Sequence, residues 1–178
     1  MTIHTQHQYP NIGALLAIHA EELERNPYGF FEITYSLRKG WEAFVGKSIK
    51  QGERESSAIA RSIGATAEGA ALRALESITA KPAWLSKILA GIAQEKGDHP
   101  GIALLFERHS RLASLPELPN AFVEIAYTRH TGWCAWLCSD DLLVNPRRTI
   151  LAHATGHTVD DAARLTAQMS HSLGGAYA

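Results

Sequence analysis

The sequence predicts an α+β protein made of two copies of one α-β-β-β-α unit, related by a pseudo-two-fold axis. Residues 27–78 align with residues 119–170 without a gap, at an offset of 92. The alignment holds thirteen identities over 52 positions, where composition alone would give roughly three. Each copy also carries apolar residues at helical and at strand spacing. Each is therefore expected to form a three-stranded antiparallel sheet with helices on one face.

The first helix of each unit is expected to begin near a proline. Residues 12–25 carry apolar side chains at helical spacing and an acidic outer face. The segment PNIGALL at Pro10 resembles PGIALL at Pro100, so the second copy should begin in the same way.

A β-hairpin follows the first helix. Residues 30–37 are rich in aromatic and β-branched side chains, residues 38–40 form a turn ending in glycine, and residues 41–47 return as a second strand. Alternation places Ile33 and Tyr35 on one face, with Phe30 and Glu32 on the other. Either the face with Ile33 and Tyr35 or the face with Phe30 and Glu32 must pack on the helices. The other face is then left partly open.

A third strand is expected at residues 57–63, ended by Gly64. The last helix then starts at Thr66, whose hydroxyl can cap free backbone N–H groups, and Glu68 complements the positive helix end. In the second copy the same roles fall to Thr158, Asp160 and Asp161.

The two units cover residues 10–81 and 100–172, and residues 82–99 are expected to form a packed helical connector. A unit of about 70 residues lies near the lower limit of independent stability. We therefore expect the two units to pack together as a pseudo-dimer.

Composition limits the classes of function. Apolar residues make up 46% of the chain, charged residues 20%, and the net charge is -1, so bulk electrostatic binding of a long nucleic acid is not expected. Cys134 and Cys138 are expected on one strand, too far apart to bridge, as buried thiols of a reducing compartment. With no signal-peptide pattern or apolar run of bilayer length, the sequence favours a cytoplasmic protein without a cofactor.

The order α-β-β-β-α with an alanine-rich last helix resembles the double-stranded-RNA-binding domain. That family anchors phosphate with a lysine-rich start to its second helix. Here the corresponding positions include Glu68, Asp160 and Asp161, and carboxylates there would repel phosphate. The resemblance thus implies topology and not RNA binding.

The run G-x-T-x-x-x-A-A, at residues 64–71 and 156–163, resembles the strand-to-helix junction of antitoxins of the HicB type. Those antitoxins have a partial ribonuclease-H-like β-β-β-α fold and bind a toxin protein. This resemblance implies a protein partner.

Two pairs of shared residues are the candidate partner-binding set. Glu32 and Glu124 are the acidic residues kept in strands of both copies, and Phe30 and Phe122 share their face. The carboxylates could hold a metal or share a proton near the pseudo-two-fold axis. The other interpretation is that they are exposed strand residues that pair with a neighbouring Arg or Lys, and this interpretation is favoured.

His153 and His157 have the spacing of a helical zinc site. The repeat alignment places His153 in a strand and His157 in a turn, so no metal site is predicted.

A nucleic-acid surface is the alternative site. It would combine basic loop residues with tryptophans that stack on bases. Its members are Arg38, Lys39, Trp41, Lys47, Lys50, Arg129, Trp133, Arg147 and Arg148.

The sequence favours a non-enzymatic, protein-binding inhibitor, antitoxin-like protein or accessory factor of a phage, plasmid or other mobile element. No catalytic residue is assigned, because no catalytic motif is present. A nucleic-acid-binding module is the first alternative. An enzyme with a site between the repeats is the second, and a homodimer is compatible with each of the three.

Overall fold

The computed structural model describes residues 9–47, 58–78, 98–118, 120–140 and 148–173. The described elements follow the expected order twice. The first unit has α1 (Pro10–Arg25), β1 (Phe30–Ser36), β2 (Gly40–Gly46), β3 (Ala58–Gly64) and α2 (Ala67–Glu76). The second has α4 (Pro100–Ala113), β4 (Ala121–Thr128), β5 (Gly132–Asp140), β6 (Arg148–Gly156) and α5 (Val159–Met169), then a 3-10 turn, η1 (Ser170–Leu173). Residues 82–97 of the expected connector lie outside the described residues.

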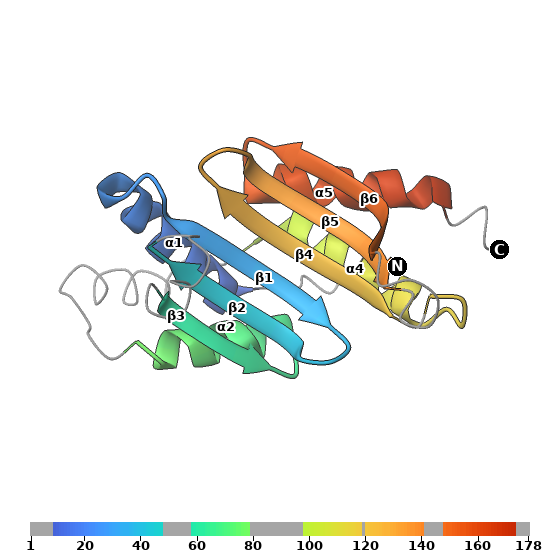
Figure 1. Ribbon diagram of the computed structural model, residues 1–178, viewed down its shortest axis with the longest axis horizontal. Helices are drawn as coiled ribbons and strands as arrows, with labels where there is room; N and C mark the ends of the chain where they lie inside the picture. Colours follow the sequence, from blue (N-terminus) through green and yellow to red (C-terminus); the bar gives the residue numbers. More distant parts are fainter. Residues whose placement is uncertain (1–8, 48–57, 79–97, 119, 141–147, 174–178) are drawn as a thin grey trace, which may run out of the picture.

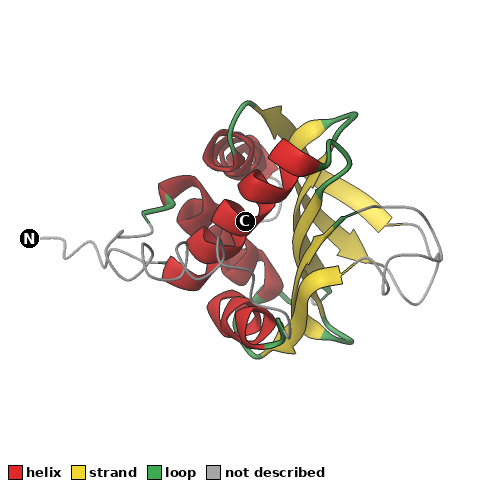
Figure 2. Cartoon of the chain, turned by 90° about the vertical axis from the view of Figure 1, so that its left-hand side faces the viewer, coloured by secondary structure: helices red, strands yellow, loops and turns green. Residues whose placement is uncertain are grey.

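The six strands form one antiparallel sheet in the order β3-β2-β1-β4-β5-β6 (Figure 1). The helices α1, α2, α4 and α5 form a second layer on one face of that sheet (Figure 2). The α+β class and the placement of the helices on one face are therefore confirmed. Among the described residues, no helix is long and apolar enough to span a membrane.

The two units join through their first strands. In the β1–β4 ladder Ile33 faces Ile125, while Phe31 faces Tyr127 and Tyr35 faces Val123. Phe31 and Val123 are equivalent positions 92 residues apart, and so are Tyr35 and Tyr127, so each of these two pairs is the symmetry equivalent of the other. The pseudo-two-fold axis therefore passes between Ile33 and Ile125, and the expected three-stranded sheets are halves of one continuous sheet.

The core lies between the sheet and the helices. Phe31 and Ile33 point into it and are fully buried, so Phe30 and Glu32 lie on the opposite face. We call this the helix-free face, because none of the described helices covers it. This settles which face of the predicted strands is covered. Cys134 and Cys138 are buried thiols, as the sequence predicts.

Close packing explains the shared G-x-T-x-x-x-A-A run. A Cβ atom on Gly64 or Gly156 would lie 2.4 Å from the backbone nitrogen of Ala70 or Ala162. The alanine side chains at both positions are fully buried. Only glycine allows the strand end to approach the helix this closely.

The helix caps differ in part from the sequence prediction. Thr66 caps its own helix, since its Oγ1 accepts from the Gly69 N–H at 3.0 Å. Glu68, however, accepts from the Asn11 N–H at 2.6 Å and the Ile12 N–H at 3.2 Å, and therefore caps α1.

The second unit repeats this arrangement. Asp160 accepts from the Ile102 N–H at 3.1 Å and caps α4. The Asp161 N–H donates to the Thr158 hydroxyl at the start of their own helix, α5. Glu68 and Asp160 lie in the first turn of their own helices, as expected. The sequence analysis missed their second role, which is to cap α1 and α4, whose own N-cap residues make no side-chain cap.

Candidate binding face

The helix-free face of the sheet is built from two rows of side chains that cross all six strands. One row runs from β3 to β6 through Arg61, Phe44, Glu32, Ala126, Cys134 and Thr155. The other runs through Ile63, Glu42, Thr34, Glu124, Trp136 and His153. The pseudo-two-fold axis exchanges the rows, since each residue in one lies 92 positions from a residue in the other.

The four residues of the predicted partner-binding set lie on this face. Glu32 and Glu124 are half-buried and stand diagonally across the pseudo-two-fold axis, one in each row. Phe30 contacts Phe44, with ring centroids 5.6 Å apart. Phe122 is only 6% exposed. The face thus combines apolar rings with carboxylates on its two central strands.

Glu42 is an ion-pair centre that the sequence analysis missed. Its side chain accepts from Arg61 Nε at 2.8 Å and lies 3.4 Å from Lys39 Nζ. Burial alone would raise the pKa of Glu42, but the hydrogen bonds and charges of Arg61 and Lys39 hold it below its ordinary value. The comparison of the two copies did not point to this ion pair, because the second copy has Cys134 at the position of Glu42 and His153 at the position of Arg61.

His153 has another role in the second unit. Its ring stacks on the indole of Trp136, with centroids 4.9 Å apart and an interplanar angle of 20°. His157 lies beyond the end of β6 and is exposed. In the described part of the chain, no three His, Cys, Asp or Glu side chains are grouped to hold a metal ion.

The predicted nucleic-acid residues are not brought together. Arg38 and Lys39 lie in the β1–β2 turn and Arg129 in the β4–β5 turn. Because β1 and β4 are antiparallel, these turns lie at opposite ends of the sheet (Figure 1). Lys47 is exposed at the end of β2, and its carbonyl accepts from the side chain of Asn26. Lys50 and Arg147, together with the side chain of Arg148, lie outside the described structure.

The two tryptophans of that set pack toward the helices. The Trp41 ring lies 4.6 Å from that of Phe106 and 5.8 Å from that of His109, centroid to centroid. The Trp133 ring lies 5.4 Å from that of His19. Both belong to the packing around the core. They are therefore not on the surface of the turns, where base stacking would need them.

Two buried histidines each contact aromatic rings of the other unit. His19 of α1 contacts Tyr127 and Trp133 of the second unit, at centroid distances of 4.8 and 5.4 Å. His109 of α4 contacts Tyr35 of the first unit at 4.9 Å. The sequence analysis missed both histidines, because their helices align at an offset of 90 and not 92.

Each of these histidines bonds the backbone near the start of the first strand of its own unit, His19 at Gly29 and His109 at Ala121. His109 Nε2 lies 3.0 Å from the Ala121 carbonyl, while Nδ1 is buried with no hydrogen-bond partner among the described residues. Burial lowers the pKa of His19 to about 4, and a hydrogen bond with Gly29 opposes that shift. Burial likewise lowers the pKa of His109, with Ala121 in the opposing role. Both rings are therefore neutral structural groups near pH 7.

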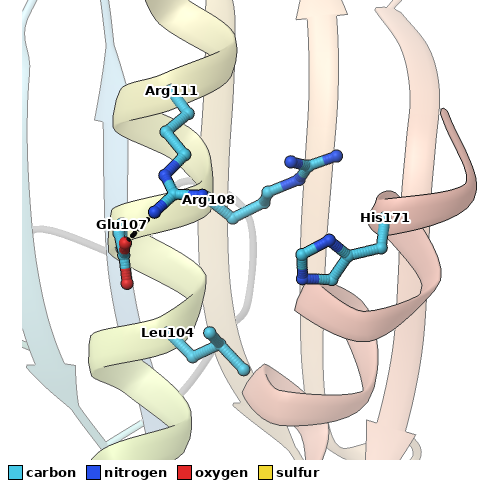
Figure 3. A pocket seen from close by; sticks show the side chains of 5 residues that line it. All are labelled: Leu104, Glu107, Arg108, Arg111 and His171. Carbon is cyan, nitrogen blue, oxygen red and sulfur yellow. Dashed lines mark hydrogen bonds and ion pairs between the residues drawn. The ribbon is translucent and has the colours of Figure 1, made fainter. Parts of the chain in front are cut away.

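Two surface hollows lie away from Glu32 and Glu124. One, of about 600 Å³, is lined by Thr131, Gly132, Thr155, Gly156, His157, Asp161, Arg164 and Leu165. The other, of about 80 Å³, lies between α4 and η1 and is lined by Leu104, Glu107, Arg108, Arg111 and His171 (Figure 3). Arg108 donates to the hydroxyl and carbonyl of Ser170, which ties the end of the second unit to α4. Neither hollow provides the enzyme site between the repeats that the second alternative requires.

No protein-family model, curated protein or solved structure matches this chain.

Proposed function

We propose that this protein is a non-enzymatic binding protein, an inhibitor or antitoxin-like accessory factor, whose helix-free sheet face receives a partner protein. One observation carries the proposal. The four described helices cover one face of the sheet, and the opposite face carries the half-buried Phe30, Glu32 and Glu124 together with Phe122, which is only 6% exposed.

The dimensions of the face favour a protein partner over a small molecule. Six strands with spacings of about 4.8 Å span about 24 Å. Strands of seven to nine residues run about 23–30 Å. One partner in an ordinary protein–protein interface contributes about 800 Å². The full extent of the sheet face is of that order, although Phe44, Glu42 and Cys134 on it are buried. Small-molecule sites, in contrast, are enclosed concave pockets.

The helix-free face carries acidic side chains near its centre. Glu32 and Glu124 are half-buried there, and Glu42 pairs with Arg61 and Lys39. Acidic side chains at the centre of a surface suit a protein partner better than a phosphate backbone. We propose that the protein acts in the cytoplasm, where its two buried thiols stay reduced.

The experiment is affinity capture with the full chain as bait, from lysate of the source cell or its host, with and without nuclease. A double variant, Glu32→Lys with Glu124→Lys, reverses the charge of the face. A matched control, Glu24→Lys with Glu76→Lys, makes the same charge change at exposed positions on α1 and α2.

A protein that is captured despite nuclease, lost with the sheet variant and kept with the helix control would support the proposal. Partners that disappear with nuclease would favour nucleic-acid binding instead. Equal capture by both variants would place the binding surface elsewhere.

A further inference from the structure

The two edges of the sheet differ, although they are equivalent strands of the two units. β3 and β6 form these edges and lie on opposite sides of the molecule (Figure 1). The backbone N–H and carbonyl groups that point outward from an edge strand can pair with a further strand, and proteins commonly protect them with covering or charged side chains. The protection of each edge therefore indicates whether another strand can add there.

Two side chains from α2 and its C-terminal end cover the outer edge of β3. The N–H of Arg61 donates to Ser77 Oγ at 3.4 Å. Arg73 Nη1 donates to the carbonyl of Ile63 at 3.5 Å. Both bonds are long, so the two side chains act mainly by occupying the space that the backbone of a further strand would need. The guanidinium of Arg73 also places a charge at this edge. β3 is therefore protected against strand addition.

β6 presents the same outward backbone groups without this cover. β6 pairs with β5 in the register in which β3 pairs with β2, so the N–H of His153 and the carbonyl of Thr155 point away from β5. In the described part of the chain, no side chain forms a hydrogen bond with either group. β6 is also longer than β3, with nine residues against seven. The edge of the second unit can therefore accept a further strand.

The side chains beside the β6 edge are apolar and exposed. Met169 stands where the first unit has Ser77, and Leu165 stands where it has Arg73. The exposed fractions are 54% for Met169 and 37% for Leu165, and Ile150 on β6 itself is 60% exposed. Burial of these side chains would stabilise an added strand through the hydrophobic effect. The second unit thus combines open backbone groups with an apolar margin.

We infer that the β6 edge is an interface between two copies of this chain, in which β6 pairs antiparallel with β6 of the second copy about a two-fold axis. The chain already uses this arrangement internally, because the equivalent strands β1 and β4 pair edge to edge about the pseudo-two-fold axis. The second copy doubles the six-stranded sheet and leaves the helices of both copies on one side. The helix-free faces of the two copies then lie next to each other on the other side.

A closed dimer explains why one edge is protected and the other is not. With two open edges, β3 of one copy could pair with β6 of the next, and such head-to-tail contacts form open-ended assemblies. With β3 covered, a further strand can add only at β6. A second β6 then closes the assembly as a two-fold dimer.

The size of the β6 edge fits such a dimer. A strand of nine residues is about 30 Å long. The sheet and helix layers together are about 20 Å deep. The edge therefore offers roughly 600 Å² per copy, which is at the lower end of the roughly 600–1,000 Å² that each partner contributes to a specific interface. The dimer should accordingly dissociate on dilution.

The test is the mass of the full chain in solution, measured by sedimentation equilibrium over a wide range of concentrations. We expect the mass to rise with concentration toward about twice that of one chain and no further. Exchange of the His153 amide hydrogen, followed by NMR, should slow as the dimer forms, because that N–H becomes paired. The amide hydrogen of Arg61, on the covered edge, should exchange at an unchanged rate.

Two reciprocal variants sharpen the test. Leu165→Arg with Met169→Ser gives β6 the side chains that cover β3, and this variant should stay monomeric at every concentration. Since both residues are exposed, its thermal midpoint should stay near that of the parent, so lost dimerisation is not lost folding. Arg73→Leu with Ser77→Met opens the β3 edge as well and should produce species larger than a dimer.

The control changes two exposed leucines of the first unit that lie away from β6. Leu37→Ser with Leu72→Arg matches the edge variant in chemistry, and it should dimerise like the parent. The Glu32→Lys, Glu124→Lys variant should also dimerise, because it alters the helix-free face and not the edge. The dimer and the proposed function are thus tested separately.

A chain that stays monomeric at every concentration would overturn the inference. A dimer that survives Leu165→Arg with Met169→Ser would overturn it too, because the two copies would then meet elsewhere. If the chain is monomeric and this variant loses a captured protein, the edge receives a strand of that partner and not a second copy.

Discussion

Ile33 faces Ile125 across the central β1–β4 ladder, and the two residues are pseudo-symmetric equivalents, 92 positions apart in the chain. Both are buried in the single core under the helices. The pair therefore joins the two halves of the sheet at the pseudo-two-fold axis, and neither half can complete its central strand pairing alone.

The first prediction concerns this pair. We expect Ile33→Val and Ile125→Val each to lower the free energy of unfolding by about 0.5–1.5 kcal/mol, because each removes one buried methylene. The double variant should depart from additivity by at least about 0.5 kcal/mol, since contacting residues couple. Urea denaturation of all four proteins measures the cycle. Full additivity would contradict direct packing of the two side chains.

The second prediction concerns pH. Folded His19 takes up a proton only near pH 4, whereas an unfolded histidine does so near pH ~6.5. Between these values the unfolded chain binds more protons, so stability is full above about pH 6.5 and falls as the pH drops toward 4. The titration of His19 alone should lower the free energy of unfolding by about 3 kcal/mol across that pH window. His109 acts in the same direction.

Urea midpoints measured from pH 7.5 to pH 4.5 check this expectation. His19→Phe removes one titrating group and should flatten the curve, although it also leaves the Gly29 carbonyl without its partner. His130→Phe, in the exposed β4–β5 turn, is the control and should leave the slope unchanged. An unaltered slope in His19→Phe would mean that another group causes the loss of stability.

The third prediction tests the caps between helices. Glu68→Ala should destabilise the protein by about 1–2 kcal/mol, because the N–H groups of Asn11 and Ile12 lose their acceptor. Asp160→Ala should have a similar effect through Ile102. Glu76 is exposed at the end of α2, and Glu76→Ala should change the free energy of unfolding by no more than about 0.5 kcal/mol. Thermal melts compare the three, and equal midpoints for Glu68→Ala and Glu76→Ala would contradict the cap.

The fourth prediction separates close approach from backbone strain. In Gly156→Ala the new Cβ would lie 2.4 Å from the Ala162 nitrogen. In Gly132→Ala the new Cβ would meet no atom beyond its chain neighbours within 4 Å, and only the φ of +67° is unfavourable. We expect Gly132→Ala to cost about 1–2 kcal/mol. Gly156→Ala should cost more, because a strand end and a helix must separate. Chemical denaturation ranks the two, and the reverse order would contradict the packing argument.

Much of the fold could be predicted from local pattern. Alternation in residues 30–37 placed Ile33 and Glu32 correctly on opposite faces, but it left open which face the helices cover. The self-alignment also located the equivalent strands. It could not indicate that β1 pairs with β4, since edge pairing depends on the geometry of two finished units and leaves no local pattern.

The candidate site was predictable in part. The shared residues Phe30, Glu32, Phe122 and Glu124 lie on the same face of the sheet because strand alternation puts them there. The alternative nucleic-acid surface would have needed Trp41 and Trp133 at the surface, but both pack toward the helices. Their partners His109 and His19 come from the other unit, and the sequence contains no signal for contacts between units.

The most direct test of the central claim is capture of a partner by the full chain, compared between the Glu32→Lys, Glu124→Lys variant and the Glu24→Lys, Glu76→Lys control. The account predicts a nuclease-resistant protein that is lost only when the sheet face is reversed. Capture that is unaffected by reversal of the sheet face, or that depends on nucleic acid, would contradict it.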